Sequence, residues 1–530
     1  MNAPIIAFRA DASVDIGLGH VMRCLTLASV LQENGARCHF LCRDLPGHLA
    51  ATIRARGVEC HLLPAADAPE DDGTTAHSRW LGVSSKRDAA QSREVLDRLS
   101  PDWLVVDHYA LDATWERATR PDGARLLVVD DLANRPHECE ILLDQNLGRD
   151  ARDYTGLVED RCALLIGPTY ALLRPEFAAH RAASLARRKA HRLAHILVSL
   201  GGVDRDDVTS RVLDTLAACP LPADSRITVV LGPSAPAREP VARRAAQMPV
   251  PTKLCIGADN MAAMMTESDL AIGAGGSTSW ERCCQGLPTL LAVLAENQAP
   301  AAKALAEAGA AIRFGDASDP VKGLADAMQV ASDPDSLAAM AGRAAGLVDG
   351  LGANRVMTEM EAYEIGVRRA HSEDAEPVYF WRYADGAARH YRASSVPSLE
   401  DHTRWFAAAL DDPSRVLLIT TWRGKDVGHV RLDLDLNAQD RATISICLNP
   451  AIRGGGRSVA ILNAALRHGS DLGLRSYRAE IHEDNVASRR LFQQSGFSEI
   501  GCEGPFRQYL AKFPVPPAFA PATDRSMELQ

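Results

Sequence analysis

A histidine at the junction between a glycine-rich turn and an amphipathic run is the first feature of this sequence that could do chemistry. His20 ends the stretch DIGLGH, in which Gly17 and Gly19 are separated by one residue. Glycines let a ligand approach the backbone closely, and the start of a helix offers free N–H groups and positive potential to an anion. A neutral imidazole there can accept a proton from water. The stretch predicts a diphosphate site with His20 as a base, and a tight turn with a capping histidine is the alternative.

A second glycine-rich segment, GAGGSTSWE at 273–281, repeats this combination later in the chain. Ser277 and Ser279 place hydroxyls at the expected helix start, and Glu281 lies inside its first turn. Hydroxyls and backbone N–H groups can hold a phosphate, while a carboxylate can accept hydrogen bonds from ribose hydroxyls. An N-capping cluster would look similar locally. Because ENQ at 296–298 follows the next expected strand, it should border the same cleft, and the two segments together favour a nucleotide site.

The elements that must position these residues alternate between strands and helices, which is the pattern of parallel α/β units. A helix is expected from His20 to Gly35, because apolar side chains recur there at helical spacing. The sequence predicts two α/β halves, 1–177 and 195–365, with a ligand cleft at the carboxyl ends of their strands. An exposed connection, 176–194, would join them. Strands are expected at 4–11, 38–44, 103–109 and 125–131 in the first half, and at 195–204, 227–232, 252–257, 269–276 and 289–294 in the second.

The character of the sequence changes after a polar and charged segment, 366–377, which is typical of a linker. Beyond it the pattern predicts a smaller α/β domain over 378–512. The tail 513–530 is rich in Pro and Ala, and we expect it to be disordered. Within the domain, a hairpin is expected at 416–435, strands at 441–450 and 476–483, and helices at 456–473 and 485–496.

Composition excludes several classes of protein. The formal net charge of −10 favours neither nucleic acid nor an anionic membrane surface as a partner. Twelve cysteines are scattered without a CxxC pair, and no signal peptide or long apolar stretch is present, so reduced thiols and a cytoplasmic location are expected. His137 and Cys139 have too few neighbours for a metal site, and no metal is expected. The Arg-rich stretch 181–192 predicts a solvated face, and the seven tryptophans predict packing anchors rather than ligand platforms.

The chain from about residue 5 to about residue 345 resembles one family of enzymes in six ordered motifs: FRADASVDIGLGHVMRCLTLA, VVDHYALD, GPTYALLRPEF, SLGGVD, GAGGSTSWE and ENQ. They resemble the UDP-2,4-diacetamido-2,4,6-trideoxy-β-L-altropyranose hydrolases of pseudaminic acid biosynthesis, a route that serves flagellin glycosylation. The resemblance implies an α/β fold of two Rossmann-like halves in a GT-B arrangement. It also implies metal-free hydrolysis of the C1–oxygen bond of a UDP-sugar, with inversion and release of UDP.

The resemblance assigns roles to individual residues. His20 would activate water, and Tyr109 of the DHY motif would support it at the sugar. UDP is a good leaving group once its charge is held, so the reaction mainly requires an oriented water molecule and a base. The remaining substrate contacts would come from Asp11, Gly17, Gly19, Asp107, Arg174, Gly275, Gly276, Ser277, Ser279, Glu281, Asn297 and Gln298.

Residues 378–512 resemble the GNAT acetyltransferases, including those that acetylate sugar nucleotides, through RGGGRS at 453–458 and NVASRRLFQQSGF at 485–497. Two positions depart from that family: Ser458 replaces a small Gly or Ala, and Phe492 stands where many members carry a tyrosine acid. Tyr509 is a substitute acid, and a packed strand residue explains it equally well. The resemblance implies acetyl-CoA as cosubstrate, bound by Arg453, Gly454, Gly456, Arg457, Ser458, Asn485 and Ser488.

Three functions stay open at this point. The first is a bifunctional enzyme that acetylates a UDP-4-amino sugar and hydrolyses the UDP-diacetamido sugar. The second is a GT-B glycosyltransferase that passes the sugar to an acceptor, with an appended acetyltransferase. The third is a sensor that binds UDP-sugars without turnover, and the placement of His20 argues against it.

Overall fold

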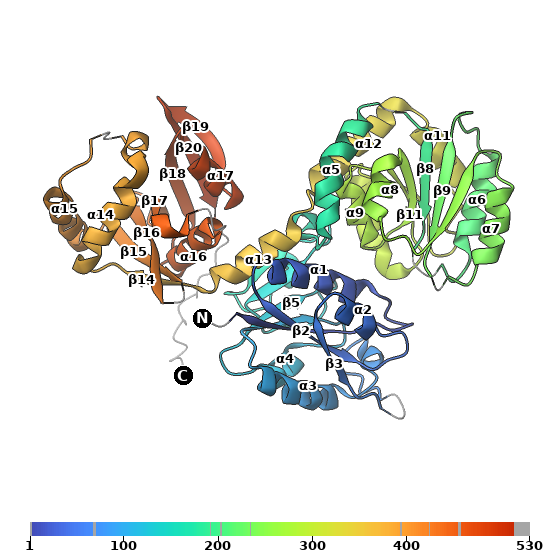
Figure 1. Cartoon of the computed structure of the whole chain (residues 1–530), viewed down its shortest axis with the longest axis horizontal. Helices are drawn as coiled ribbons and strands as arrows, with labels where there is room; N and C mark the ends of the chain where they lie inside the picture. Colours follow the sequence, from blue (N-terminus) through green and yellow to red (C-terminus); the bar gives the residue numbers. More distant parts are fainter. Residues whose placement is uncertain are drawn as a thin grey trace, which may run out of the picture. The chain divides into compact units, whose positions relative to one another are not determined.

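The computed structural model describes residues 3–66, 70–190, 192–201, 204–233, 235–392, 395–422, 424–453 and 457–512. The chain divides into two compact units, Met1–Val356 and Met357–Gln530 (Figure 1). The tail 513–530, expected to be disordered, and the glycines at 454–456 lie outside the described residues. Within the described ranges, no helix is both long enough and apolar enough to span a bilayer.

The first half of the first unit is a seven-stranded parallel sheet in the order β3-β2-β1-β4-β5-β6-β7. The strands predicted there are confirmed as β1, β2, β4 and β5, and their central runs are buried because both sheet faces are covered. Its strands are β1 (Ile5–Ala10), β2 (Arg37–Arg43), β3 (Glu59–Leu63), β4 (Trp103–Asp107), β5 (Arg125–Val129), β6 (Ile141–Asp144) and β7 (Ala163–Ile166). Its helices are α1 (Gly19–Glu33), α2 (Ala50–Ala55), α3 (Ser85–Leu99) and α4 (Ala113–Thr119), with short 3₁₀ helices at η1 (Ser78–Leu81), η2 (Ala151–Tyr154) and η3 (Pro168–Tyr170).

The second half is a six-stranded parallel sheet in the order β10-β9-β8-β11-β12-β13. Helices α6 and α7 cover one face, and α8 and α9 cover the other (Figure 1). Both sheets reverse strand order beside their first strand, and this reversal places the ligand crevice of a Rossmann-like fold at the carboxyl ends of the strands. Its strands are β8 (His195–Ser199), β9 (Arg226–Leu231), β10 (Thr252–Ile256), β11 (Leu270–Ala274), β12 (Thr289–Ala292) and β13 (Ile312–Gly315). Its helices are α6 (Val208–Ala218), α7 (Arg238–Ala246), α8 (Met261–Glu267), α9 (Thr278–Cys284), α10 (Ala299–Glu307), α11 (Leu324–Ala331) and α12 (Pro334–Leu347).

Two helices link the halves. The segment expected to be an exposed connection is α5 (Pro175–Arg188), whose Phe177 is buried in the apolar core of the second half. The start of α13 (Gly352–Ala362) lies against the first half, where Arg355 Nη1 donates to the carbonyl of Thr169 at 2.8 Å. Gly352 has no room for a side chain, because a Cβ there would lie 2.3 Å from the carbonyl oxygen of Ala171.

The second unit is a seven-stranded sheet in the order β14-β15-β16-β17-β18-β20-β19. The expected linker 366–377 is wrong, because β14 (Ile365–Arg369) pairs antiparallel with β15 (Arg415–Trp422) and α14 (Ala375–Tyr383) follows it. Only Ile365 is buried in this strand, which forms one edge of the sheet, so its sequence carries little apolar signal. The other elements are α15 (Leu399–Asp411), β16 (Lys425–Leu434), β17 (Arg441–Leu448), α16 (Ser458–Asp471), β18 (Ser476–His482), α17 (Val486–Gln494), β19 (Ser498–Glu503) and β20 (Phe506–Lys512).

One strand pair of this sheet is parallel. β17 and β18 pair from Arg441–Thr443 to Ser476–Arg478, and the pairing covers only the first part of each strand. Helices α14 and α15 lie on one face of the sheet, and α16 and α17 lie on the other (Figure 1).

Candidate active site

His20 is the second residue of α1 and makes its closest contact with a carboxylate from a neighbouring strand. Its Nδ1 lies 2.6 Å from Oδ1 of Asp107, the last residue of β4. β1 pairs with β4, so the turn after β1 brings α1 directly over the end of β4. The N-cap residue of α1, Leu18, makes no side-chain capping bond. His20 itself lies inside the helix and pairs with Asp107, so its ring does not cap α1 and is held as a histidine–carboxylate pair.

Asp107 also binds Arg23, one turn further along α1. The Nε and Nη2 atoms of Arg23 each donate to this carboxylate at 2.6 Å, and Nη1 donates to Asp131 at 3.0 Å. Burial alone would raise the pKa of Asp107, but the charges of Arg23 and His20 hold it well below its usual range. Asp107 is completely buried, so we correct its expected contact with substrate: it is a fixed anion that positions His20.

Asp11 also lies beneath the site rather than in it. Arg9 donates to both of its carboxylate oxygens, at 2.6 and 2.8 Å, and the backbone N–H of Arg43 donates at 2.7 Å. Its exposure is zero. The expected contact of Asp11 with substrate is corrected in the same way: the residue joins the ends of β1 and β2.

Aromatic rings surround the exposed side of His20. The Tyr109 ring meets His20 edge-on, with the centroids 4.7 Å apart, and stacks on Trp80 of η1 at 5.6 Å. His77 lies between them, 5.2 Å from Tyr109 and 4.7 Å from Trp80. Burial and the neighbouring Asp131 carboxylate raise the pKa of Tyr109, so its hydroxyl stays protonated and hydrogen-bonds to Asp131. Trp80 and His77 were not predicted as site residues, because no local pattern reveals that η1 reaches the end of β4.

The two glycine-rich turns are open toward this side of the sheets. A Cβ added at Gly17, Gly19 or Gly276 would meet no heavy atom within 4 Å. Gly17 has a φ of +82°, which favours glycine. Gly275 differs, because its Cβ would lie 3.4 Å from the Gln298 side chain. Gly17, Gly19 and Gly276 thus leave room for a ligand, whereas Gly275 lets α10 pack.

The predicted nucleotide segment brings Glu281 and Arg174 together. Arg174 precedes α5 and pairs with Glu176 at 3.1 Å and with Glu281 at 3.9 Å. Burial raises the pKa of Glu281, and the Arg174 charge opposes that shift. The N-cap residue Ser277 makes no side-chain capping bond. The alternative of an N-capping cluster requires such a bond at Ser277.

The other polar residues of this segment support its backbone. Arg282 is buried under the turn, where it donates to the carbonyl of Ala274 at 2.8 Å and to Oγ of Ser279 at 3.0 Å. Burial lowers the pKa of Arg282 to about 10, so it remains charged at neutral pH. Oε1 of Gln298 accepts from the backbone N–H of Leu294 at 3.0 Å. Ser279 and Gln298 thus shape the turn, and the side chain of Asn297 lies outside the described residues.

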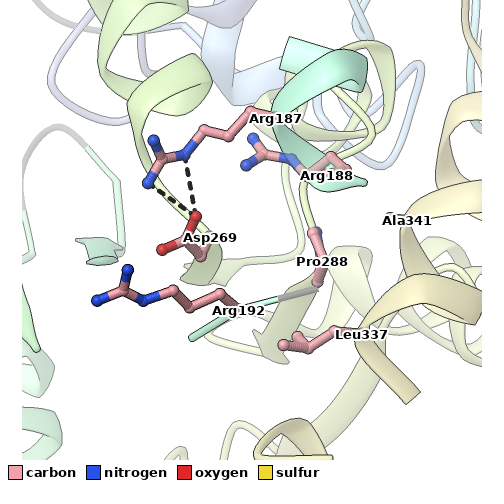
Figure 2. A pocket seen from close by; sticks show the side chains of 7 residues that line it. All are labelled: Arg187, Arg188, Arg192, Asp269, Pro288, Leu337 and Ala341. Carbon is pink, nitrogen blue, oxygen red and sulfur yellow. Dashed lines mark hydrogen bonds and ion pairs between the residues drawn. The ribbon is translucent and has the colours of Figure 1, made fainter. Parts of the chain in front are cut away.

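The Arg-rich end of α5 lines a small pocket at the opposite ends of the strands (Figure 2). Arg187 pairs with Asp269, which precedes β11, at 2.9 Å. Arg188 donates to the carbonyls of Ser268 and Met265, and Arg181 donates to those of Val348 and Ala345. The predicted solvated face is confirmed in part. Residues 182, 183, 186, 187, 189 and 190 are exposed, whereas Arg181 and Arg188 are partly buried and donate to carbonyls that end other elements.

In the second unit, Tyr509 is a packed strand residue. It is fully buried in β20, and its hydroxyl accepts from Arg489 Nε at 3.1 Å and donates to Glu499 at 3.2 Å. The expectation that it protonates a departing thiolate is corrected, because both roles of the hydroxyl are occupied inside the protein. Phe492 is also buried, with its ring 4.9 Å from that of Phe497.

The expected acetyl-CoA residues lie at the starts of α16 and α17. Ser458 is the first residue of α16, and the guanidinium of Arg457 lies 4.2 Å from the centre of the Trp422 ring. Arg453 donates to the carbonyl of Leu448 at 3.1 Å. Asn485 caps α17 by accepting from the N–H of Ser488 at 3.1 Å. Gly454 and Gly456 fall outside the described residues.

Comparisons with known proteins find different relatives for different parts of the chain. A family model described as an acetyltransferase (GNAT) domain matches residues 364–498. The spore coat polysaccharide biosynthesis protein SpsG of Bacillus subtilis is 33% identical over 310 residues, which cover 58% of this chain and 82% of that protein. The UDP-2,4-diacetamido-2,4,6-trideoxy-beta-L-altropyranose hydrolase of Campylobacter jejuni is 26% identical over 273 residues, or 51% of this chain and 85% of that protein. The crystal structure of Acinetobacter baumannii MurG aligns with a TM-score of 0.51 at 16% identity, over 67% of this chain and 98% of that one, which supports the GT-B arrangement.

Proposed function

Because the chain belongs to the family of SpsG and the Campylobacter UDP-sugar hydrolase and carries a GNAT domain behind that part, we propose that it is bifunctional. These relatives and the GNAT domain support a nucleotide-sugar enzyme with an acetyltransferase. Our proposal for the first unit is hydrolysis of UDP-2,4-diacetamido-2,4,6-trideoxy-β-L-altropyranose to UDP and free sugar, as a step of pseudaminic acid biosynthesis. The second unit N-acetylates the UDP-4-amino precursor with acetyl-CoA.

The observation that carries the hydrolase proposal is the 2.6 Å contact between His20 and Asp107 beside an open glycine turn. In the proposed step, Nε2 of His20 takes a proton from a water molecule. The hydroxide oxygen bonds to C1 of the sugar as the bond from C1 to the UDP oxygen breaks on the opposite face, so the configuration inverts. Asp107 holds Nδ1 and stabilises the imidazolium formed, which is the role of the carboxylate in a histidine–carboxylate pair.

The leaving group requires charge stabilisation rather than protonation. We assign the diphosphate to the turn at Gly17 and Gly19, whose helix α1 offers its positive end, and to the turn at Gly276. Arg282 beneath the second turn adds a permanent positive charge. Glu281 accepts hydrogen bonds from the ribose hydroxyls, and the Arg174 guanidinium lies 3.9 Å from that carboxylate.

The sugar is assigned to the aromatic side of His20. Tyr109 and Trp80 present stacked rings next to the imidazole, and such surfaces suit the methyl groups of a 6-deoxy, N-acetylated sugar. The Tyr109 hydroxyl hydrogen-bonds to Asp131, so the proposal assigns the Tyr109 ring, and not its proton, to the sugar. This arrangement favours a sugar with few hydroxyls.

The variant His20→Asn tests the hydrolase assignment. With acetyl-CoA and the UDP-4-amino sugar, it should accumulate the UDP-diacetamido sugar, because acetyl transfer belongs to the other unit. Losing a general base lowers the rate by roughly 10²- to 10⁴-fold. Hydrolysis within a few-fold of the wild-type rate would overturn the proposal.

Two other functions are separated by product analysis of the wild-type protein. A glycosyltransferase of the GT-B type would release little UDP until an acceptor is added. A sensor would bind the UDP-sugar without releasing UDP at all. Release of free sugar at a rate independent of added acceptors supports the hydrolase.

A further inference from the structure

A cluster of three potential metal ligands lies on one face of the first sheet, away from His20. His39 is in β2, and Glu59 and His61 are in the neighbouring edge strand β3. His39 is the register partner of Glu59, and His61 lies two residues further along, so the three side chains share a face. All three are near the amino ends of their strands, whereas His20 follows the carboxyl end of β1.

The spacing of the two histidine nitrogens matches a coordination sphere, and the carboxylate oxygen lies beside them. Nδ1 of His39 lies 2.8 Å from Oε2 of Glu59 and 3.4 Å from Nε2 of His61, and one such atom from each residue lies within 4.8 Å of the others. A tetrahedral ion with metal–nitrogen bonds of about 2.1 Å holds its ligand atoms about 3.4 Å apart. The two nitrogens therefore already stand at the separation that one shared ion would impose.

The donor groups of the cluster are of the kinds that bind divalent cations. Nδ1 of His39 shares a proton with Oε2 of Glu59 at 2.8 Å, and a divalent cation would displace that proton and bind both atoms together with Nε2 of His61. Only 3% of the His39 surface is exposed, so this ligand is buried. The Glu59 side chain is 69% exposed, which leaves a path by which an ion can enter from solvent.

We propose that His39, Glu59 and His61 form a site for Zn²⁺ or Co²⁺, with water in the fourth position. This donor set of two imidazoles and one carboxylate is one that Zn²⁺ takes in proteins with water in the fourth position. Arg37, Arg54 and Arg98 add positive charge nearby and weaken the affinity. The site ties the edge strand β3 to β2, and it does not depend on the proposed function.

The test is titration of the full-length protein with Zn²⁺ alone after chelator treatment, followed calorimetrically. The matched variants are His61→Asn and Glu59→Gln, and the control is His48→Asn, another half-exposed histidine, which pairs with Asp44 at 3.3 Å. Wild type and the control should bind one equivalent, and each ligand variant should bind it at least about tenfold more weakly. Hydrolysis of UDP-sugar should be the same in all four proteins.

Co²⁺ provides a second measurement. Wild type should show the visible absorption of a tetrahedral nitrogen and oxygen site, and His61→Asn should lose it. The proposal is overturned if wild type shows no saturable Zn²⁺ uptake, or if His61→Asn and Glu59→Gln bind Zn²⁺ as wild type does. A cobalt spectrum dominated by thiolate charge transfer would also overturn it, since it would assign the ion to a cysteine.

Discussion

The substitution Asp107→Asn isolates what the buried carboxylate does for His20. It keeps the shape of the side chain but removes the negative charge that lies 2.6 Å from Nδ1 of the imidazole. When His20 takes a proton from water, an ion pair forms in wild type and is lost in the variant. Two unit charges about 4 Å apart at an effective dielectric constant of about 20 attract by about 4 kcal/mol. We therefore expect kcat for UDP-sugar hydrolysis to fall about 10³-fold.

The assay is the release of UDP at saturating UDP-sugar by wild type, Asp107→Asn, His20→Asn and the double variant. Because both residues serve one proton transfer, the double variant should be no slower than His20→Asn alone. Affinity for UDP should stay near that of wild type. The control Asp131→Asn removes the other carboxylate bound by Arg23, at 3.0 Å, and should change kcat by only a few-fold.

Folding of Asp107→Asn is checked by thermal unfolding. Arg23 keeps its ion pair with Asp131 in this variant, so its guanidinium is not left without an anion. If Asp107→Asn kept kcat within a few-fold of wild type, or if the two substitutions had additive effects, the positioning role of Asp107 would be refuted.

Four further predictions follow from other parts of the chain. Trp80→Ala should raise KM for the UDP-sugar by roughly 2- to 12-fold, which corresponds to the free energy of one aromatic contact. The inhibition constant of UDP should stay unchanged. Steady-state kinetics with the UDP-sugar and with UDP measures both quantities. Glu281→Ala should weaken UDP binding, measured by calorimetry, without lowering kcat. Glu176→Ala removes the other carboxylate that pairs with Arg174 and should leave UDP binding unchanged. Equal weakening by both substitutions would show that only the charge of Arg174 affects UDP binding. Burial raises the pKa of Asp144 from 3.8 to about 7, so the folded state retains a proton that the unfolded state loses, and stability should fall as pH rises from about 4 to about 7. Urea unfolding at pH 5 and pH 8 should show a smaller difference for Asp144→Asn than for wild type. A fragment that begins at Glu364 should fold and acetylate, whereas one that begins at Val378 loses β14 and should aggregate in light scattering, because β15 would become an exposed edge.

Local patterns predicted much of the first unit. The buried strands were recognisable as apolar runs of residues. Both glycine turns were predicted because glycines between a strand and a helix indicate a turn there. The open space at Gly17 and Gly276 agrees with that prediction.

The role of Asp107 was not predictable from local pattern. It lies 87 residues from His20, and only the pairing of β1 with β4 brings the two together. The resemblance to known enzymes placed Asp107 among the substrate contacts, whereas the structure shows it fully buried and 2.6 Å from His20.

Two other predictions differ from the structure for the same reason: the residues concerned form hydrogen bonds with backbone groups. Arg181 and Arg188 of α5 donate to backbone carbonyls at the ends of other elements. The pattern of side chains in a sequence does not predict where such carbonyls lie. The strand β14 was interpreted as a linker because it ends in two adjacent arginines, and its pairing with β15 is made by the backbone. Patterns of side chains predict burial well and predict such backbone contacts poorly.

The buried position of Arg282 has a consequence for how ionic strength affects the protein. Its hydrogen-bond acceptors are neutral oxygens, those of Ala274 and Ser279, so its charge is held under the turn without a paired carboxylate in these contacts. Mobile ions screen exposed charges over a Debye length of about 10 Å at 0.1 M salt, but they cannot surround a buried one. An anion bound at this turn would therefore keep most of its affinity in concentrated salt, whereas binding that relied on surface arginines would weaken.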